Sequence, residues 1–173
     1  PIRKGEKIGA TRVIPLIIEE EKIIKAEELV EKNIIYVEEI KPKKCLLITT
    51  GNEVYKGIIK DAFLPVIKSK LGYYGSEVTR QVILPDSKER IIEEIQKGLA
   101  ENIDMIICTG GMSVDPDDVT PTAIKECGGE LVTYGSPVLP GAMFLLAYYN
   151  NVPILGVPSC AMYSKRTVLD LVL

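Results

Sequence analysis

The chain is built around Thr109-Gly110-Gly111-Met112-Ser113-Val114-Asp115-Pro116-Asp117-Asp118-Val119-Thr120-Pro121. This stretch follows an apolar run, Met105 to Cys108, that is typical of a buried strand. It ends where Thr120, as N-cap, and Pro121 predict the start of a helix. Paired glycines let a backbone approach a ligand closely, and clustered aspartates repel one another unless a positive group binds among them. We therefore interpret the stretch as a ligand-binding loop between a strand and a helix.

Strand and helix patterns alternate along the chain on both sides of this loop. Apolar runs predict strands at 45–48, 77–84, 104–108, 131–133 and 153–157. Helical periodicity predicts helices over 58–72, 91–99, 121–128, 141–149 and 163–173, with a kink or late restart at Pro65. Such an order predicts a three-layer α/β fold, with a mostly parallel sheet and helices on both faces. Ligands of these folds bind beyond the carboxyl ends of the strands.

The first 42 residues follow a different pattern. The runs 11–18 and 34–37 are strand-like, and 23–32 has the pattern of a short helix. This is too little sequence to bury a core of its own. We expect residues 1–42 to be the strand-rich remnant and linker of a preceding domain. Residues 43–173 are then expected to form the α/β domain, truncated at its C-terminus.

Composition excludes several classes of function. The chain has 173 residues, a net charge of −3 and no histidine. The charge argues against nucleic acid as a partner, and no apolar run approaches the roughly 18 residues of a membrane span. Without histidine, Ser-His-Asp and Cys-His catalysis are excluded, and any metal is expected to be a hard ion such as Mg²⁺ held by oxygen. The cysteines at 45, 108, 127 and 160 show no metal-binding spacing, which predicts reduced thiols in a cytoplasmic protein.

Two motifs in this order resemble a known family. Thr109-Gly110-Gly111 followed by Asp118-Val119-Thr120-Pro121, together with the upstream Thr50-Gly51-Asn52-Glu53, resembles the molybdopterin-binding domain of molybdenum cofactor biosynthesis proteins. The resemblance covers the chain from about Lys43 to its end. It implies binding of molybdopterin, a pterin dithiolene phosphate, in adenylyl transfer or molybdate insertion, with Mg²⁺ and with ATP or AMP. It also implies a homo-oligomer, a trimer or a dimer, and contacts with other molybdenum-cofactor proteins.

The resemblance further implies roles for individual residues. Asp86 and Asp118 would be catalytic and would hold the metal. The cofactor-binding residues would be Thr50, Gly51, Asn52, Glu53, Thr109, Gly110, Gly111, Met112, Ser113, Pro140, Gly141, Pro158 and Ser159. Pro140 and Gly141 would precede a helix whose N-terminus binds phosphate.

Several of these residues also have ordinary structural interpretations. Asp86 stands where an N-cap is expected, with Glu89 three residues later as in a capping box. Asp115 and Asp117 suit a plain loop, and Asp61 suits the solvated face of a helix.

The sequence departs from the family pattern at Ser159, where the family has a glycine, and Cys160 follows it. A Cβ at position 159 would narrow the approach of a phosphate. This departure favours one alternative, a non-catalytic module that carries or senses the cofactor. A second alternative is a nucleotide hydrolase, because the same domain resembles part of proteins that act on nicotinamide nucleotides or ADP-ribose.

Overall fold

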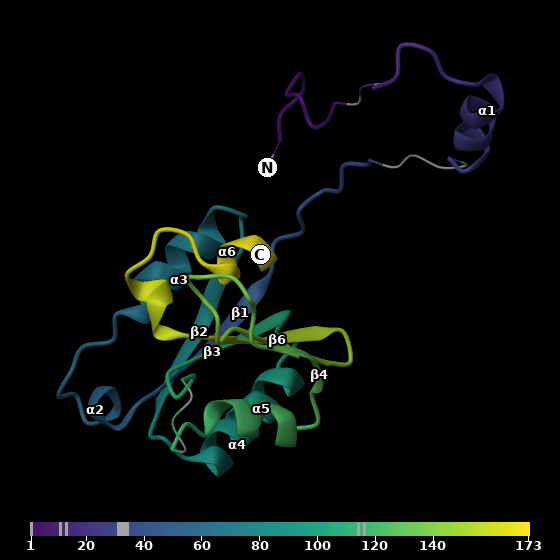
Figure 1. Ribbon diagram of the computed structural model, residues 1–173. Coiled ribbons are helices and arrows are strands. Elements are labelled where there is room, and N and C mark those ends of the chain that lie inside the picture. Colours follow the sequence, from purple (N-terminus) through teal and green to yellow (C-terminus); the bar gives the residue numbers. More distant parts are fainter. Residues whose placement is uncertain (1, 11, 13, 31–34, 114, 116) are drawn as a thin grey trace. The chain divides into compact units, whose positions relative to one another are not determined.

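The computed structural model describes residues 2–10, 12, 14–30, 35–113, 115 and 117–173, and divides into two compact units, Pro1–Ile40 and Lys41–Leu173 (Figure 1). The described residues of the first unit are all exposed and contain one helix, α1 (Glu20–Glu28). The helix expected over 23–32 thus begins three residues earlier; positions 31 and 32 lie outside the described residues. No strand forms at 12, 14–18 or 35–37, so the strand expectations fail there, and positions 11, 13 and 34 are not described.

The second unit is built on a six-stranded sheet in the order β2-β1-β3-β6-β5-β4. Four neighbouring strands are parallel: β2 (Glu77–Leu84), β1 (Lys44–Thr50), β3 (Met105–Thr109) and β6 (Val152–Val157). β5 (Leu145–Tyr149) runs antiparallel to β6, and β4 (Glu130–Tyr134) runs antiparallel to β5. The mostly parallel sheet and the five predicted strands are confirmed.

Helices cover both faces of this sheet (Figure 1). One face carries α3 (Phe63–Gly72), the 3₁₀ turn η1 (Ser159–Met162) and α6 (Val168–Val172). The other face carries α4 (Lys88–Ala100) and α5 (Thr120–Glu126). A short helix, α2 (Asn52–Tyr55), follows β1. The predicted three-layer α/β fold is therefore confirmed.

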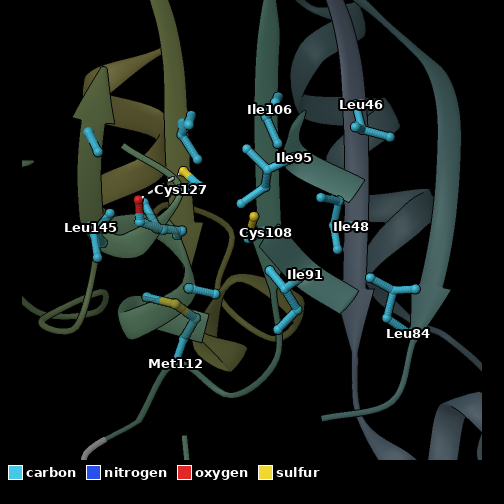
Figure 2. Close-up of a cluster of buried hydrophobic side chains, with 14 of the residues drawn as sticks. Leu46, Ile48, Leu84, Ile91, Ile95, Ile106, Cys108, Met112, Cys127 and Leu145 are labelled. Atoms are coloured by element: carbon cyan, nitrogen blue, oxygen red, sulfur yellow. Dashed lines mark hydrogen bonds between the residues drawn. The ribbon is translucent and has the colours of Figure 1, made fainter. Parts of the chain in front are cut away.

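The apolar run of β1 is continuous because both faces of the strand are buried. Leu46 and Ile48 pack with Ile95 of α4 in one core cluster (Figure 2), whereas Cys45 and Leu47 belong to the cluster on the α3 side. All five side chains are fully buried. Successive residues of a strand point to opposite faces, so a central strand of a three-layer fold needs no polar position.

The helix predicted over 141–149 is wrong, because this segment contains strand β5. Leu145 and Ala147 are fully buried, whereas Leu146 between them is only partly buried and Tyr148 is exposed, which is the two-residue period of a strand. The segment pairs with β4 on one side and β6 on the other. Ladder pairing and burial between two strands override the helix propensity of its alanine, methionine and leucine residues.

The helix predicted over 58–72 begins late, at Phe63, as the position of Pro65 allowed. The Asp61 carboxylate accepts hydrogen bonds from the backbone N–H groups of Phe63 (2.9 Å) and Leu64 (3.1 Å). Asp61 is therefore a half-buried helix cap, and its expected place on a solvated helix face is wrong. Ile58, expected in the helix, is exposed in the preceding loop.

The last predicted helix, over 163–173, is shorter than expected. Residues 163–167, which follow η1, are not helical, and α6 begins only after Thr167. Thr167 and Asp170 form a capping box: the Thr167 N–H donates to Asp170 Oδ2 at 2.7 Å. This Thr-x-x-Asp spacing is visible in the sequence and is a sufficient signal for the late start. Among the described residues, no helix is long and apolar enough to cross a membrane.

Candidate functional site

The loops that follow three parallel strands border one open cavity of about 820 Å³. The three strands are β1, β2 and β3, so the cavity lies where a doubly wound sheet binds ligands, beyond the carboxyl ends of its strands. Its described lining contains four aspartates and no basic side chain, and consists of Gly51, Asn52, Asp86, Gly111, Asp115, Asp117, Asp118 and Val119. The sequence predicted this location.

A second, smaller cavity of about 190 Å³ adjoins the first. It is less acidic and contains two methionines; its described lining is Gly110, Gly111, Met112, Ser113, Asp118, Met143, Pro158 and Ser159. Gly111 and Asp118 belong to both cavities. Asp118 therefore stands where the two cavities meet.

The carboxylate of Asp118 shapes the loop that contains it. Its Oδ2 atom accepts hydrogen bonds from the backbone N–H groups of Ser113 (2.8 Å) and Asp115 (3.3 Å), and its own N–H donates to the carbonyl of Asp115 (3.0 Å). Asp118 thus has a structural role whether or not it binds a ligand. Its Oδ1 atom lies next to Gly111, at the junction of the cavities.

Asp86 connects the loops after β1 and β2, because its Oδ2 atom accepts the backbone N–H of Asn52 at 3.0 Å. The N-cap of α4 is instead Ser87, whose hydroxyl oxygen accepts the N–H of Arg90 at 3.4 Å. The capping-box interpretation of Asp86 is therefore wrong. The Glu89 carboxylate accepts a hydrogen bond from the Ser87 hydroxyl. Asp86 therefore lines the larger cavity and binds the backbone of Asn52, and it does not cap α4.

The first motif glycine allows β1 and β3 to end in close contact. Gly110 has a φ of +84°, and a Cβ there would lie 2.7 Å from Thr50 Oγ1 and closer still to the Thr50 carbonyl oxygen. Thr120 donates its hydroxyl to the Gly110 carbonyl at 2.9 Å. Thr120 is the first residue of α5 and Val119 its N-cap, so the predicted N-cap role of Thr120 is wrong. Gly110 thus serves the scaffold, while Gly111 lines both cavities.

Three predicted site residues near these loops do not line either cavity. Thr109 is fully buried and donates its hydroxyl to the Ile48 carbonyl (3.4 Å) and to Thr49 Oγ1 (3.3 Å). Thr50 is buried in contact with Thr120. Glu53 is exposed on α2, and its carbonyl accepts the N–H groups of Ile58 and Ile59. The two threonines support the loops from beneath.

Pro140 and Gly141 also lie away from the described linings of both cavities. The Pro140 carbonyl accepts the N–H of Val168 at 3.1 Å, and a Cβ on Gly141 would lie 2.9 Å from that nitrogen. Because the segment packs on the start of α6 and leads into a strand, the predicted phosphate-binding helix N-terminus at this place is wrong. Its neighbour Met143 reaches the smaller cavity instead, which the sequence did not indicate.

Two further residues of interest come from later in the chain. Ser159, at the start of η1, lines the smaller cavity with Pro158, whereas the partly exposed Cys160 is not among its lining residues. Tyr134, at the end of β4, donates its hydroxyl to the Ser113 carbonyl at 3.2 Å. No sequence signal indicated Tyr134, because it is brought to the loop by strand pairing alone.

A protein-family model described as "Probable molybdopterin binding domain" matches residues 46–173. The chain belongs to this family. The match covers the whole sheet except the first two residues of β1, and all the loops that line the two cavities. Membership agrees with the resemblance carried by the Thr-Gly-Asn-Glu and Thr-Gly-Gly motifs.

Curated relatives are similar to this chain over part of their length. A protein of Pyrobaculum calidifontis is 39% identical over 87 residues, which are 50% of this chain and 33% of that protein. A CinA-like protein of Thermosipho melanesiensis is 38% identical over 91 residues, 52% of this chain and 22% of that protein. A molybdopterin molybdenumtransferase of Staphylococcus epidermidis is 27% identical over 110 residues, which are 64% of this chain and 26% of that protein. The chain thus spans a third or less of these relatives.

Solved structures share the fold. The protein CinA of Thermoplasma acidophilum has a TM-score of 0.61 at 20% identity, covering 69% of this chain and 90% of that one. The molybdopterin biosynthesis enzyme MoaB of Thermus thermophilus has a TM-score of 0.58 at 21% identity, covering 67% and 80%. Identities this low support the α/β fold alone.

The site contains carboxylates that could bind a metal ion, but its described residues form no complete set of metal ligands. In the part of the chain that the structure describes, no three Asp, Glu or Cys side chains converge as a metal site. Mg²⁺ usually binds through one or two carboxylates, several waters and substrate phosphates. Asp86 and Asp118, which line the same cavity, fit that mode of binding.

Proposed function

We propose that the two joined cavities bind molybdopterin, and that the chain acts in adenylyl transfer to it or in molybdate insertion. The observation that carries this proposal is that Asp86 and Asp118, from loops after two different strands, line one cavity with glycines of both motifs. Family membership supports molybdopterin as the ligand. The position of the cavities beyond the carboxyl ends of the strands supports them as the binding site.

The difference between the cavities supports a division of the ligand. The larger one, with its aspartates and backbone groups, suits a phosphate or nucleotide accompanied by a cation. The smaller one, with Met112, Met143 and Pro158, suits a flat and polarisable ring, and Ser113 and Ser159 supply hydroxyls for its polar edge. Asp118, at the junction, would lie near the phosphate that joins the two parts.

Asp86 and Asp118 are proposed as the residues that position the reacting phosphate. Each uses its Oδ2 atom to accept backbone N–H groups, which fixes the orientation of the carboxylate. Within the described residues the Oδ1 atom of each accepts no hydrogen bond, so it can face a ligand. Bound Mg²⁺ would supply neutralisation of phosphate charge between these carboxylates. The contribution of the protein is positioning and electrostatic stabilisation.

The acidic lining makes cation-free binding of phosphate unfavourable. Two unit charges 4 Å apart repel by about 1 kcal/mol in water and by about 4 kcal/mol at an effective dielectric constant near 20. The four aspartates of the larger cavity face no lysine or arginine among its described lining residues. We therefore expect phosphate-bearing ligands to bind much more tightly with a divalent cation than without one.

The same acidic lining favours a second candidate, hydrolysis of a Mg²⁺-bound nucleotide diphosphate such as ADP-ribose. This function needs the larger cavity and its carboxylates but not the smaller one. Ser159, whose side chain would take up space in the smaller cavity that a glycine would leave free, is compatible with it. A carrier or sensor of the cofactor would instead use both cavities without turnover.

One experiment separates these functions. The purified chain is incubated with molybdopterin, ATP and Mg²⁺, and separately with ADP-ribose and Mg²⁺, and products are separated by chromatography and identified by mass spectrometry. Adenylylated molybdopterin is the expected product, and it should disappear in Asp118→Asn. Binding of molybdopterin without any product would exclude adenylyl transfer and leave molybdate insertion or the carrier role. Hydrolysis of ADP-ribose without binding of pterin would contradict the proposal and establish the second candidate.

A further inference from the structure

Ser113, in the motif loop, is held by two side chains: Asp118 of the same loop and Tyr134, which is 21 residues later in the sequence. Its N–H donates to Asp118 Oδ2 at 2.8 Å, and its carbonyl accepts the hydroxyl of Tyr134 at 3.2 Å. Both backbone polar groups of Ser113 are therefore engaged. Since Ser113 lines the smaller cavity, these two bonds fix the shape of one of its walls.

Tyr134 is suited to act as a permanent donor. Only the protonated phenol can donate to a carbonyl oxygen. Burial of the phenol and, secondly, the negative charge of Asp118 raise the pKa of Tyr134 above its ordinary value. The hydroxyl thus stays protonated at neutral pH.

The backbone around Tyr134 is anchored to the core. Tyr134 is paired with the fully buried Leu145 of β5, and the next residue, Gly135, donates its N–H to the carbonyl of the buried Phe144 at 2.9 Å. The hydroxyl therefore extends from a fixed strand to the motif loop. Tyr134 is not among the described lining of either cavity, so any effect on a ligand must pass through Ser113.

We propose that Tyr134 is a positioning residue that holds the Ser113 segment of the motif loop in its ligand-binding shape. The effect on the loop is independent of what the site binds. The effect on affinity rests on the proposed function, the binding of molybdopterin. The hydrogen bond joins β4, at one edge of the sheet, to the loop of β3, in its middle.

Tyr148 provides a matched control for the removal of a hydroxyl. It is 38% exposed, against 39% for Tyr134, and lies on the neighbouring strand β5. In the described part of the chain its hydroxyl makes no hydrogen bond to the protein. Tyr134→Phe and Tyr148→Phe therefore remove the same atom from similar environments, and only the first breaks a bond to the motif loop.

The test combines hydrogen–deuterium exchange with binding. In Tyr134→Phe we expect faster exchange in the peptides covering 110–119, with exchange over β1 and α4 unchanged, whereas Tyr148→Phe should match the wild type throughout. Affinity for molybdopterin should fall roughly 2- to 12-fold in Tyr134→Phe alone, the net worth of one neutral hydrogen bond. Wild-type exchange in the 110–119 peptides of Tyr134→Phe, or an equal change in both variants, would overturn the proposal. Failure of the wild type to bind molybdopterin would instead contradict the proposed function and leave the exchange result to decide the role of Tyr134.

Discussion

Replacing Gly110 by alanine tests the contact on which the site is built. Two costs follow from the structure. At a φ of +84°, an L-residue is strained by about 1–2 kcal/mol. The new Cβ would also lie within 2.7 Å of the Thr50 side chain and against the Thr50 carbonyl, and overpacking of this kind costs about 1–3 kcal/mol more. The expected loss of unfolding free energy is therefore about 2–5 kcal/mol.

The assay is unfolding in urea and by heat, followed by circular dichroism. A loss of this size should lower the melting temperature by roughly 4–20 °C, at about 2–4 °C per kcal/mol for a chain of this length. Gly57→Ala is the matched control, because Gly57 has a φ of +71° and a Cβ added there would have no neighbouring atom within 4 Å. The control should lose only the backbone cost. Equal losses in the two variants would refute the close contact between the ends of β1 and β3.

Two further predictions concern groups outside the cavities. Burial alone would raise the pKa of Asp170, but hydrogen bonds from Lys70 and from the Thr167 backbone N–H lower this pKa overall. The ionised carboxylate therefore stabilises the fold at pH values above about 4, the pKa of an aspartate in the unfolded chain. Asp170→Asn should therefore be less stable than the wild type at pH 7, with the difference shrinking as pH falls below about 4; a difference constant across that range in urea titrations would contradict this assignment. Burial raises the pKa of the Cys45 thiol to about 12, so iodoacetamide at pH 8 should label Cys160, the one cysteine that is not buried, long before Cys45. Rapid labelling of Cys45 in the native protein, measured by peptide mass spectrometry, would show that the core around β1 opens.

The fold was predictable wherever the burial of a segment is reflected in the local pattern of apolar residues. A continuous apolar run such as Cys45–Ile48 can lie only where both faces are covered, and runs of this kind marked the central parallel strands. The segment that became β5 was mispredicted because its leucine, alanine and methionine residues favour a helix, and only pairing with β4 and β6 decides otherwise.

The location of the candidate site was predictable from the sequence, but the residues that line it were only partly predictable. Glycines and aspartates beyond strand ends marked the larger cavity, because the topology of a parallel sheet gathers those loops. The same reasoning could not separate Thr109, which is buried beneath the loops, from Ser113, which lines a cavity. Tyr134 and Met143 reach the site through the antiparallel β4–β5 pair, whose register no local pattern encodes.

The most direct test of the account is the affinity of the chain for molybdopterin, measured by titration calorimetry with and without Mg²⁺. Asp86→Asn and Asp118→Asn remove charge from the larger cavity while keeping an oxygen that accepts the backbone N–H. Asp104→Asn is the control, because Asp104 also accepts a backbone N–H (Lys44, 2.9 Å) but lies at the opposite end of β3.

We expect Mg²⁺-dependent binding by the wild type and by Asp104→Asn, and binding weakened at least about tenfold in the two site variants, the loss of one charge-assisted contact. Binding of equal strength in all four proteins, or no binding by a folded wild type, would contradict the central claim that these cavities are a molybdopterin site.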